Sequence, residues 1–330
     1  MKILFVTGGN SRSFKISPVV QSQGDSLKDA GISVDYFPVT GKGIIGYLRC
    51  TLRLRQYIKE NHYDIIHAHY TLSGWAAVLA FSGKPIILSL MGTDAYGKYY
   101  DVRKRKLLKS YLTLLTYVIQ PFVSGIVCKS KSIEEYVYTK HKSFVIPNGV
   151  SLDQIEYRKN GLKEELNLSS NRKYVLFLGN KESRIKNYNL VKAAFQYIDI
   201  PDVSLIAPYP VRHDTVIKYL NTVDVLVMSS LTEGSPNVVK ESMACGCPVV
   251  ATNVGDVEWL FGEEPGYFIS DFDPVDMAEK IKQALRYSEL YGKTNGRRRI
   301  IELGLDSKTI ALKLVDVYKA VLRTNKYEKS

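Results

Sequence analysis

Two glutamates, Glu233 and Glu241, lie eight positions apart across a loop that the sequence predicts to lead into a helix. A short apolar run of the kind found in strands buried on both faces precedes this loop. Ser235 is a predicted N-cap, and Pro236 falls at the first helical position, where proline is tolerated. A glycine follows where helix ends favour one, so we predict a helix over residues 236–245.

This arrangement suits a diphosphate that carries a sugar on one side and a ribose on the other. Free backbone N–H groups at a helix N-terminus attract phosphate. Glu233 precedes the helix, where it could accept hydrogen bonds from a sugar, whereas Glu241 lies about 7.5 Å along the helix axis, within reach of both ribose hydroxyls. The alternative is two acidic residues favoured near a helix start by its dipole. The segment predicted to contact the nucleotide-diphosphate sugar also contains Gly234, Ser235, Pro236, Asn237 and Val238.

A loop with two bases follows the predicted strand Val175–Leu178. Arg184 and Lys186 lie between the end of that strand and a helix predicted to start near Asn187. Cations at this point would offset the charge that develops on a departing nucleoside diphosphate, which is usually the dominant contribution to such catalysis. The alternative is an ordinary solvated basic loop. We assign the phosphate contact to Lys186 and Arg184, and we include Asn180, next to the glycine at the strand end, in the donor contact.

The first predicted strand ends in a glycine pair, Gly8 and Gly9, where the absence of a side chain lets the backbone approach a phosphate or an acceptor. The pair is not part of a G-x-G-x-x-G motif, and no acidic residue follows the second strand as a dinucleotide site requires. Taken alone, the pair fits a tight turn as well as a functional loop. We predict that Gly8 and Gly9 contribute to the donor site.

Two histidines and an aspartate close the next strands of the N-terminal half. His67 and His69 end the third strand, and strand alternation places both on one face of the sheet. An H-x-H pair is compatible with zinc, but no third ligand is evident nearby, so we expect at least one of the two to be a buried, hydrogen-bonded histidine. We predict that His69 lines the ligand cleft. Asp94 closes the following strand and is predicted either to face the acceptor or to have a structural role.

Short apolar runs alternate with longer amphipathic runs, which indicates parallel sheets flanked by helices. We therefore predict an α/β fold of two Rossmann-like domains, residues 1–155 joined by a returning helix within 307–330, and residues 156–306. Ligands of such sheets bind at the carboxyl ends of the strands. The predicted strands are Ile3–Val6, Val34–Phe37, Ile65–His67, Ile86–Leu90, Gly125–Cys128, Phe144–Ile146, Val175–Leu178, Val203–Ile206, Val225–Met228, Val249–Ala251 and Tyr267–Ile269.

The composition is that of a folded protein, since 330 residues suffice for two domains and an apolar content of 45% excludes general disorder. No apolar stretch reaches transmembrane length without interruption, and the N-terminal run is too short for a signal peptide. The four cysteines show neither a disulfide framework nor a paired zinc motif. We therefore expect a cytoplasmic protein with reduced, buried thiols and no metal site.

Excess positive charge is concentrated in the N-terminal half. Residues 1–150 carry a net charge of +11 and residues 151–330 a net charge of +1, which together account for the total of +12. Two stretches, Tyr47–Lys59 and Arg103–Lys109, mix bases with apolar residues at helical spacing, as in segments that lie peripherally on an anionic membrane surface. The alternative is a solvated helix face. Nucleic acid could use the same charge, but no recognised binding motif accompanies it, so we predict no nucleic-acid partner.

Several of these segments together resemble the retaining GT-B glycosyltransferases of family 4. The E-x7-E pattern, with Glu-Gly-x-Pro ahead of the helix and Met-Ala-Cys-Gly-x-Pro-Val-Val after it, is characteristic of that family. Ser183–Asn187 resembles the basic loop that clamps the donor diphosphate, and Ile146–Val150 resembles the strand-to-linker signature. Ala68–Tyr70 and Gly92–Asp94 match the N-terminal half. The likeness covers about residues 5 to 260 and is closest to the bacterial polysaccharide branch, which includes enzymes of the teichuronic acid type.

The resemblance implies a GT-B fold, with two sheets facing across a cleft and a C-terminal helix that crosses back. It also implies transfer of a sugar, with retention, from a nucleotide-diphosphate donor to a saccharide or lipid-linked acceptor in cell-surface polysaccharide assembly. Glu233, Lys186 and Arg184 would then be the catalytic residues, and no metal or other cofactor would be needed. The chain departs from the family at Asn180, usually arginine, and at Met91, a histidine in many relatives. The alternatives are a GT-B sugar-nucleotide epimerase or phosphorylase, and a nonenzymatic nucleotide-sugar or membrane-binding module.

Overall fold

The computed structural model describes the chain except residues 12–13, 42, 102–105, 109–110, 156–161 and 328–330. The fold divides into two compact units, which we call unit 1 (Met1–Asp101, Lys106–Gly149 and Ser307–Ser330) and unit 2 (mainly Val150–Asp306). This division falls before residue 155, where the sequence analysis placed the boundary. The reason is that Val150 pairs with Asp306 in an isolated parallel bridge and donates its N–H to the Leu305 carbonyl at 2.9 Å.

Unit 1 contains a parallel sheet, as the alternation of apolar runs predicts. The strand order is β2-β1-β3-β4-β7-β8, so β2 and β3 lie on opposite sides of β1. Strands β3, β4 and β7 are buried along their whole length, which explains their mainly apolar sequences. The six strands are β1 (Lys2–Gly8), β2 (Ser33–Val39), β3 (Ile65–His69), β4 (Ile86–Leu90), β7 (Gly125–Cys128) and β8 (Ser143–Val145).

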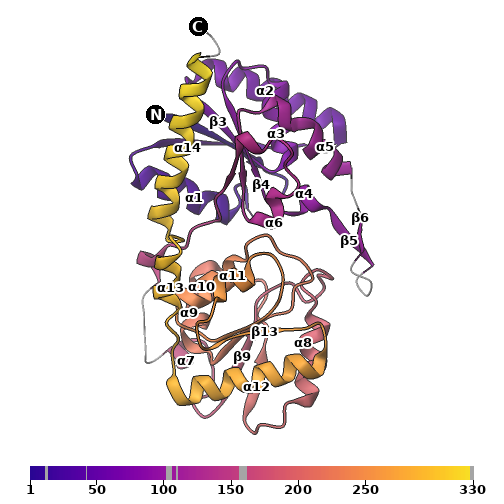
Figure 1. The fold of residues 1–330 in the computed structure, drawn as a ribbon, viewed down its shortest axis with the longest axis vertical. Helices are drawn as coiled ribbons and strands as arrows, with labels where there is room; N and C mark the ends of the chain where they lie inside the picture. The colour runs from indigo at the N-terminus through magenta and orange to yellow at the C-terminus, as the bar shows by residue number, and fades with distance from the viewer. Residues whose placement is uncertain (12–13, 42, 102–105, 109–110, 156–161, 328–330) are drawn as a thin grey trace. The chain divides into compact units, whose positions relative to one another are not determined.

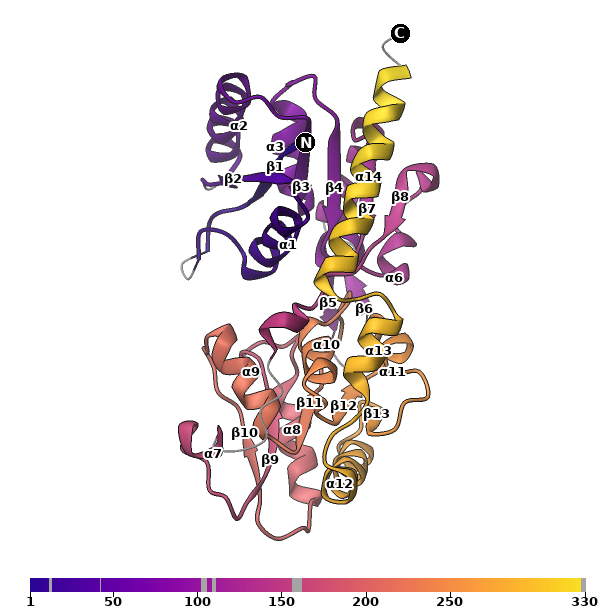
Figure 2. The same ribbon diagram turned by 90° about the vertical axis from the view of Figure 1, so that its left-hand side faces the viewer.

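Helices cover both faces of this sheet (Figures 1 and 2). On one face, Leu54, Ala77 and Ile119 from α2, α3 and α5 join a single core with the strand side chains. On the other face, α1 and α14 contact each other, so the C-terminal helix belongs to unit 1. The helices are α1 (Pro18–Asp29), α2 (Gly43–Glu60), α3 (Thr71–Leu79), α4 (Thr93–Tyr96), α5 (Tyr111–Ile119), α6 (Lys131–Glu134) and α14 (Ser307–Tyr327).

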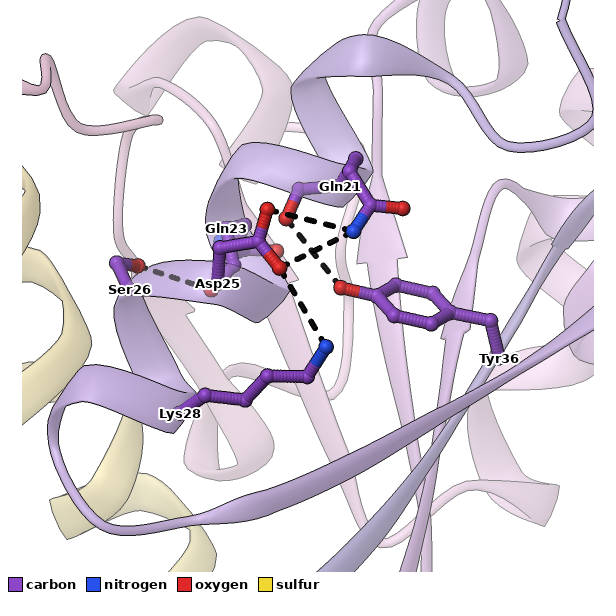
Figure 3. Close-up of polar contacts among 6 residues, drawn as sticks. All are labelled: Gln21, Gln23, Asp25, Ser26, Lys28 and Tyr36. Atoms are coloured by element: carbon purple, nitrogen blue, oxygen red, sulfur yellow. Dashed lines mark hydrogen bonds and ion pairs between the residues drawn. The ribbon is translucent and has the colours of Figure 1, made fainter. Parts of the chain in front are cut away.

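The packing of α1 against β2 depends on a glycine and a tyrosine (Figure 3). A Cβ atom at Gly24 would lie only 1.9 Å from the Tyr36 hydroxyl oxygen, so a larger residue there would require the Tyr36 side chain to move. The Tyr36 hydroxyl donates to the Gln21 carbonyl at 3.3 Å, and the Gln21 side-chain amide donates to Asp25 at 3.1 Å. Lys28 contacts the same carboxylate at 3.4 Å. This polar cluster connects α1 to β2 through Tyr36.

Unit 2 contains a second parallel sheet, of order β10-β9-β11-β12-β13. Its central strands pack against α8 and α12 through Val175, Val191, Val227 and Ile281. The strands are β9 (Lys173–Phe177), β10 (Val203–Ile206), β11 (Val225–Met228), β12 (Val249–Thr252) and β13 (Tyr267–Ser270). The helices are α7 (Leu162–Glu165), α8 (Tyr188–Ala194), α9 (His213–Thr222), α10 (Asn237–Ala244), α11 (Val257–Phe261), α12 (Pro274–Tyr291) and α13 (Gly296–Glu302).

One predicted helical segment is wrong. In the basic stretch Arg103–Lys109, residues Lys106–Leu108 form strand β6, which pairs antiparallel with β5 (Lys98–Asp101). Local pairing with β5 therefore overrides the helical spacing, and residues 102–105 lie outside the described part of the chain. The four cysteines are buried and unpaired, as expected. Within the described residues, no helix combines the length and apolar character that a membrane crossing requires.

Candidate functional site

The predicted helix between Glu233 and Glu241 is α10, but it starts one residue later than predicted. Pro236 is the N-cap, and no side chain among the described residues caps the helix start. The predicted cap, Ser235, therefore does not have that role. At the other end, Gly246 adopts the left-handed conformation with φ +68°, which agrees with the glycine signal in the sequence. The first backbone N–H groups of α10 are left without a side-chain acceptor.

The start of α10 lies at the topological switch point of unit 2. Strand β9 pairs with β10 on one side and with β11 on the other, and a ligand binds at such a reversal in open α/β sheets. Hydrogen bonds connect the loop after β9 to the loop after β11. The Ser229 hydroxyl donates to the carbonyls of Lys186 and Asn187 at 2.9 Å each, and the Leu231 N–H donates to the Ile185 carbonyl at 2.8 Å.

This joining brings the predicted basic loop to the first glutamate. Lys186 Nζ lies 2.6 Å from Glu233 Oε1, with 35% and 18% of the two side chains exposed. Arg184 is in the same loop and exposed. The Asn180 carboxamide accepts the Glu182 N–H at 3.0 Å and so shapes the turn that follows β9. Lys186 and Glu233 therefore lie together, and Arg184 belongs to the same loop as Lys186.

The second glutamate has a histidine partner that the sequence analysis did not identify. Glu241 Oε1 lies 2.9 Å from His213 Nε2, and 17% of the Glu241 side chain is exposed. Hydrogen bonding to Glu241 raises the pKa of His213, against the opposing effect of burial. His213 is the first residue of α9. Sequence spacing gives no signal for the contact, since the two residues are far apart along the chain.

A buried lysine is the other feature that the sequence analysis missed. Lys240 is fully buried on α10, and its Nζ donates to the Ser235 hydroxyl at 3.1 Å. Burial lowers the pKa of Lys240 to about 8, while the negative charges of Asp256 and Glu241 act in the opposite direction. A signal was present in the sequence: Lys240 lies three residues before the buried Met243, on the same helix face.

The glycine pair predicted for the donor site ends β1, in unit 1. Gly8 is exposed and has open space around its position. Gly9 donates its N–H to the Val39 carbonyl at 2.9 Å, and a Cβ atom there would lie 2.6 Å from the Pro38 Cβ. Gly9 is therefore required by the packing of the β1 end against β2. Only Gly8 leaves an open backbone at the carboxyl edge of the sheet.

The two histidines at the end of β3 are buried and stacked, with ring centroids 4.4 Å apart. His67 contacts the Tyr318 hydroxyl at 2.7 Å and the Ser89 hydroxyl at 2.8 Å. His69 Nε2 is shielded from solvent and has no hydrogen-bond partner among the described residues. Burial lowers the pKa of both rings well below the ordinary value, so both are neutral. Within the described residues, no three His, Cys, Asp or Glu side chains are grouped to bind a metal.

Asp94 is fully buried behind the loop that follows β4. One oxygen accepts the N–H groups of Met91 and Gly92 at 3.0 and 2.9 Å. The other accepts the N–H and hydroxyl of Thr71 at 3.1 and 3.4 Å. Burial raises the pKa of Asp94 to about 6 despite these hydrogen bonds. The carboxyl group thus fixes the β4 loop to the start of α3.

Two family models match the two halves of the chain. The model for Glycosyltransferase Family 4 matches residues 10–154, and the model for Glycosyl transferases group 1 matches residues 202–287. The first match lies almost entirely in unit 1, and the second lies within unit 2 and contains Glu233, Glu241 and Lys240.

The chain is also similar to individual proteins. TuaC of Bacillus subtilis, named for teichuronic acid biosynthesis, is 25% identical over 66% of this chain and 60% of its own length. The Escherichia coli UDP-Gal:alpha-D-GlcNAc-diphosphoundecaprenol alpha-1,3-galactosyltransferase is 23% identical over 81% of this chain and 78% of its own length. The crystal structure of Anabaena HepE with UDP-glucose superposes with a TM-score of 0.76 and 16% identity, covering 97% of this chain and all of HepE.

The chain spans about three fifths of the length of TuaC, but nearly the whole of the solved structure. The two-sheet topology, the two family matches and the bacterial relatives agree with one another. They confirm the resemblance that the motifs around Glu233 and Glu241 indicate. This chain belongs to the family 4 glycosyltransferases and has their GT-B fold.

Proposed function

We propose that the chain transfers a sugar from a nucleotide-diphosphate donor to a saccharide or lipid-linked acceptor, with retention, in the assembly of a cell-surface polysaccharide. The observation that carries this proposal is the Lys186–Glu233 pair, 2.6 Å apart, in front of the uncapped start of α10. Helix N–H groups and a nearby ammonium are suited to hold a diphosphate, and a carboxylate is suited to accept sugar hydroxyls. Glu241, one turn further along α10, would accept the ribose hydroxyls.

The same groups supply the chemistry. As the bond to the sugar breaks, negative charge grows on the leaving diphosphate, where Lys186, Arg184 and the N-terminus of α10 would offset it. The acceptor hydroxyl would attack the sugar from the face that the diphosphate leaves. An oxygen of the leaving phosphate would accept the proton of that hydroxyl, and attack from this face would retain the anomeric configuration. Glu233 would hold the sugar through its hydroxyls while Lys186 moves from the carboxylate to the diphosphate. We propose that this charge compensation replaces a metal, so activity should survive chelation.

Calorimetry with UDP and GDP, followed by transfer assays with their sugar conjugates, tests this function. Glu241→Ala should weaken nucleotide binding about tenfold or more, because a charge-assisted hydrogen bond contributes about 1.5–3 kcal/mol. Unchanged affinity would remove Glu241 from the donor site. Donor interconversion without an acceptor would instead identify an epimerase, and a requirement for orthophosphate a phosphorylase. Normal donor binding without transfer or hydrolysis would leave a binding module.

We also propose a lipid-linked acceptor at the inner face of the cell membrane, because unit 1 carries an exposed amphipathic surface. On α2, Leu48 and Leu52 are 52% and 67% exposed and flank the exposed bases Arg49 and Arg53. Helix α3 contacts both α2 and α5, and the three helices lie on the same face of the sheet (Figure 1). The exposed apolar residues of this surface are Ile45, Leu48, Leu52, Phe81, Tyr111, Leu114, Val118 and Phe122.

Apolar side chains set among bases are typical of segments that bind a bilayer interface, where each base contributes about 1 kcal/mol next to anionic lipid. The E. coli relative, named for a diphosphoundecaprenol substrate, supports the choice of lipid. Leu48→Ser with Leu52→Ser should reduce sedimentation with phosphatidylglycerol vesicles, whereas Leu290→Ser on α12 should not. Replacing Arg103, Lys104, Arg105 and Lys106 with Gln tests the basic stretch predicted from sequence. Undiminished sedimentation of both variants would rule out this membrane surface.

A further inference from the structure

The start of α10 departs from the local preference of its sequence. Serine followed by proline favours serine as N-cap with proline at the first helical position. In the structure Pro236 is the N-cap, and the Ser235 hydroxyl accepts the Lys240 ammonium at 3.1 Å instead of capping the helix. The N–H groups of Asn237 and Val238, which a Ser235 cap would engage, therefore have no side-chain acceptor from Ser235.

The burial of Lys240 fixes this arrangement. The side chain is fully buried, and a buried ammonium is retained only where an opposite charge and hydrogen bonds offset its desolvation. Asp256 supplies opposite charge at the loop before α11. That loop contacts the α10 loop closely, since a Cβ atom at Gly255 would lie 2.5 Å from the Gly234 carbonyl oxygen. Lys240 thus bonds to the loop before α10 through Ser235 and interacts electrostatically with Asp256 in the neighbouring loop.

We propose that Lys240 is a positioning residue that holds the Ser235 hydroxyl away from the start of α10 and so keeps the first helix N–H groups open to the donor diphosphate. This inference rests on the proposed donor site. A serine cap and a phosphate would compete for the same N–H groups. Without Lys240, Ser235 would be free to cap the helix, which would extend by one residue to Pro236. Nucleotide would then have to displace that cap before binding.

The experiment compares nucleotide affinities in variants that remain folded. Lys240→Met alone would leave Asp256 as an unpaired buried charge, so the test uses Lys240→Met with Asp256→Asn, and urea denaturation verifies the fold. We expect UDP or GDP to bind about fivefold more weakly, the equivalent of an N-cap contribution of about 1 kcal/mol. Adding Ser235→Ala removes the competing hydroxyl and should restore most of the lost affinity. Lys192→Met, at an exposed position on α8, is the matched control.

The outcomes separate this inference from the donor site itself. If the wild-type protein binds neither UDP nor GDP, the donor site fails and Lys240 loses its proposed role. If wild type binds but the double variant binds equally well, Lys240 does not position the site. If affinity falls and Ser235→Ala does not restore it, the loss comes from the missing charge and the positioning role is wrong. Recovery of affinity on removal of a hydroxyl supports the proposal, because a merely structural role predicts no such gain.

Discussion

The polar side chains at the carboxyl ends of the strands differ between the two sheets in burial and in the kind of partner they contact. In unit 1, His67 and Asp94 are fully buried, their bonding atoms are occupied by neighbours, and burial shifts the pKa of each toward the neutral form. In unit 2, Glu233 and Glu241 remain partly exposed and lie against Lys186 and His213, and His213 is a cation when it is protonated. At the first edge, His67 and Asp94 are buried and hydrogen-bonded within the protein. The second holds exchangeable charge pairs, which a charged ligand could rearrange, so the two edges should respond differently to substitution.

The largest effect should follow loss of the cation in unit 2. Lys186→Ala removes the ammonium next to Glu233, and we expect the rate of sugar transfer to fall about 100-fold or more, as when an electrostatic donor is removed from an active site. Stability in urea should change little, because the pair is partly exposed. Lys192→Ala is the matched control. A wild-type transfer rate in Lys186→Ala would show that the pair is not catalytic.

The comparison predicts the reverse for Asp94 in unit 1. Asp94→Ala removes the acceptor of the N–H groups of Thr71, Met91 and Gly92, so it should cost at least about 2 kcal/mol of unfolding free energy at pH 5. The folded pKa of about 6 lies above the ordinary 3.8, so wild-type stability falls as pH rises between these values. The deficit of the variant should therefore shrink toward pH 7. A deficit that grows with pH in urea titrations would contradict the raised pKa.

A smaller loss of unfolding free energy is expected at the contact between Tyr318 of α14 and His67 of β3. Tyr318→Phe removes the hydroxyl that contacts His67 Nδ1 at 2.7 Å, and we expect about 1 kcal/mol of destabilisation because a buried ring nitrogen loses its partner. Urea denaturation measures it. Tyr291→Phe, at a position 69% exposed, is the control and should be nearly neutral. Equal stability of the two variants would show that the His67 contact does not stabilise unit 1.

The same contrast explains how far sequence reasoning reaches. Every strand of the two parallel sheets is predicted within about two residues. The buried central strands leave short, mainly apolar runs that a sequence displays directly. The antiparallel pair β5–β6 is missed because its strands are short, and only their mutual pairing makes them strands. Local signals also place the start of α10 one residue early, since the Lys240 contact with Ser235 is a tertiary effect.

The candidate site divides in the same way. Glu233, Lys186 and Glu241 can be predicted because their family pattern is contiguous with a strand end and a helix start. His213 and Asp256 cannot be predicted in this way, because each reaches the site from another part of the sheet edge. His213 pairs with the carboxylate of Glu241, and Asp256 provides negative charge near the Lys240 ammonium, so this edge contains oppositely charged partners even without a ligand. Sequence spacing identifies the groups that would contact a donor, whereas the structure identifies what those groups contact in its absence.

The smallest expected effect is a change in the pKa of His213. It tests most directly whether a ligand replaces His213 as the partner of Glu241. The pKa of His213 is raised above the ordinary 6.5 chiefly by the hydrogen bond to Glu241, so the pair stabilises unit 2 fully below pH 6.5 and loses this contribution as pH rises through the raised value. Glu241→Gln should lower the His213 pKa in NMR titrations, with the other histidines as internal controls. UDP should shift it in the same direction, because ribose hydroxyls would compete with the imidazolium for the carboxylate. A shift upward with UDP would mean that His213 binds the phosphate, and Glu241 would lose its place at the ribose.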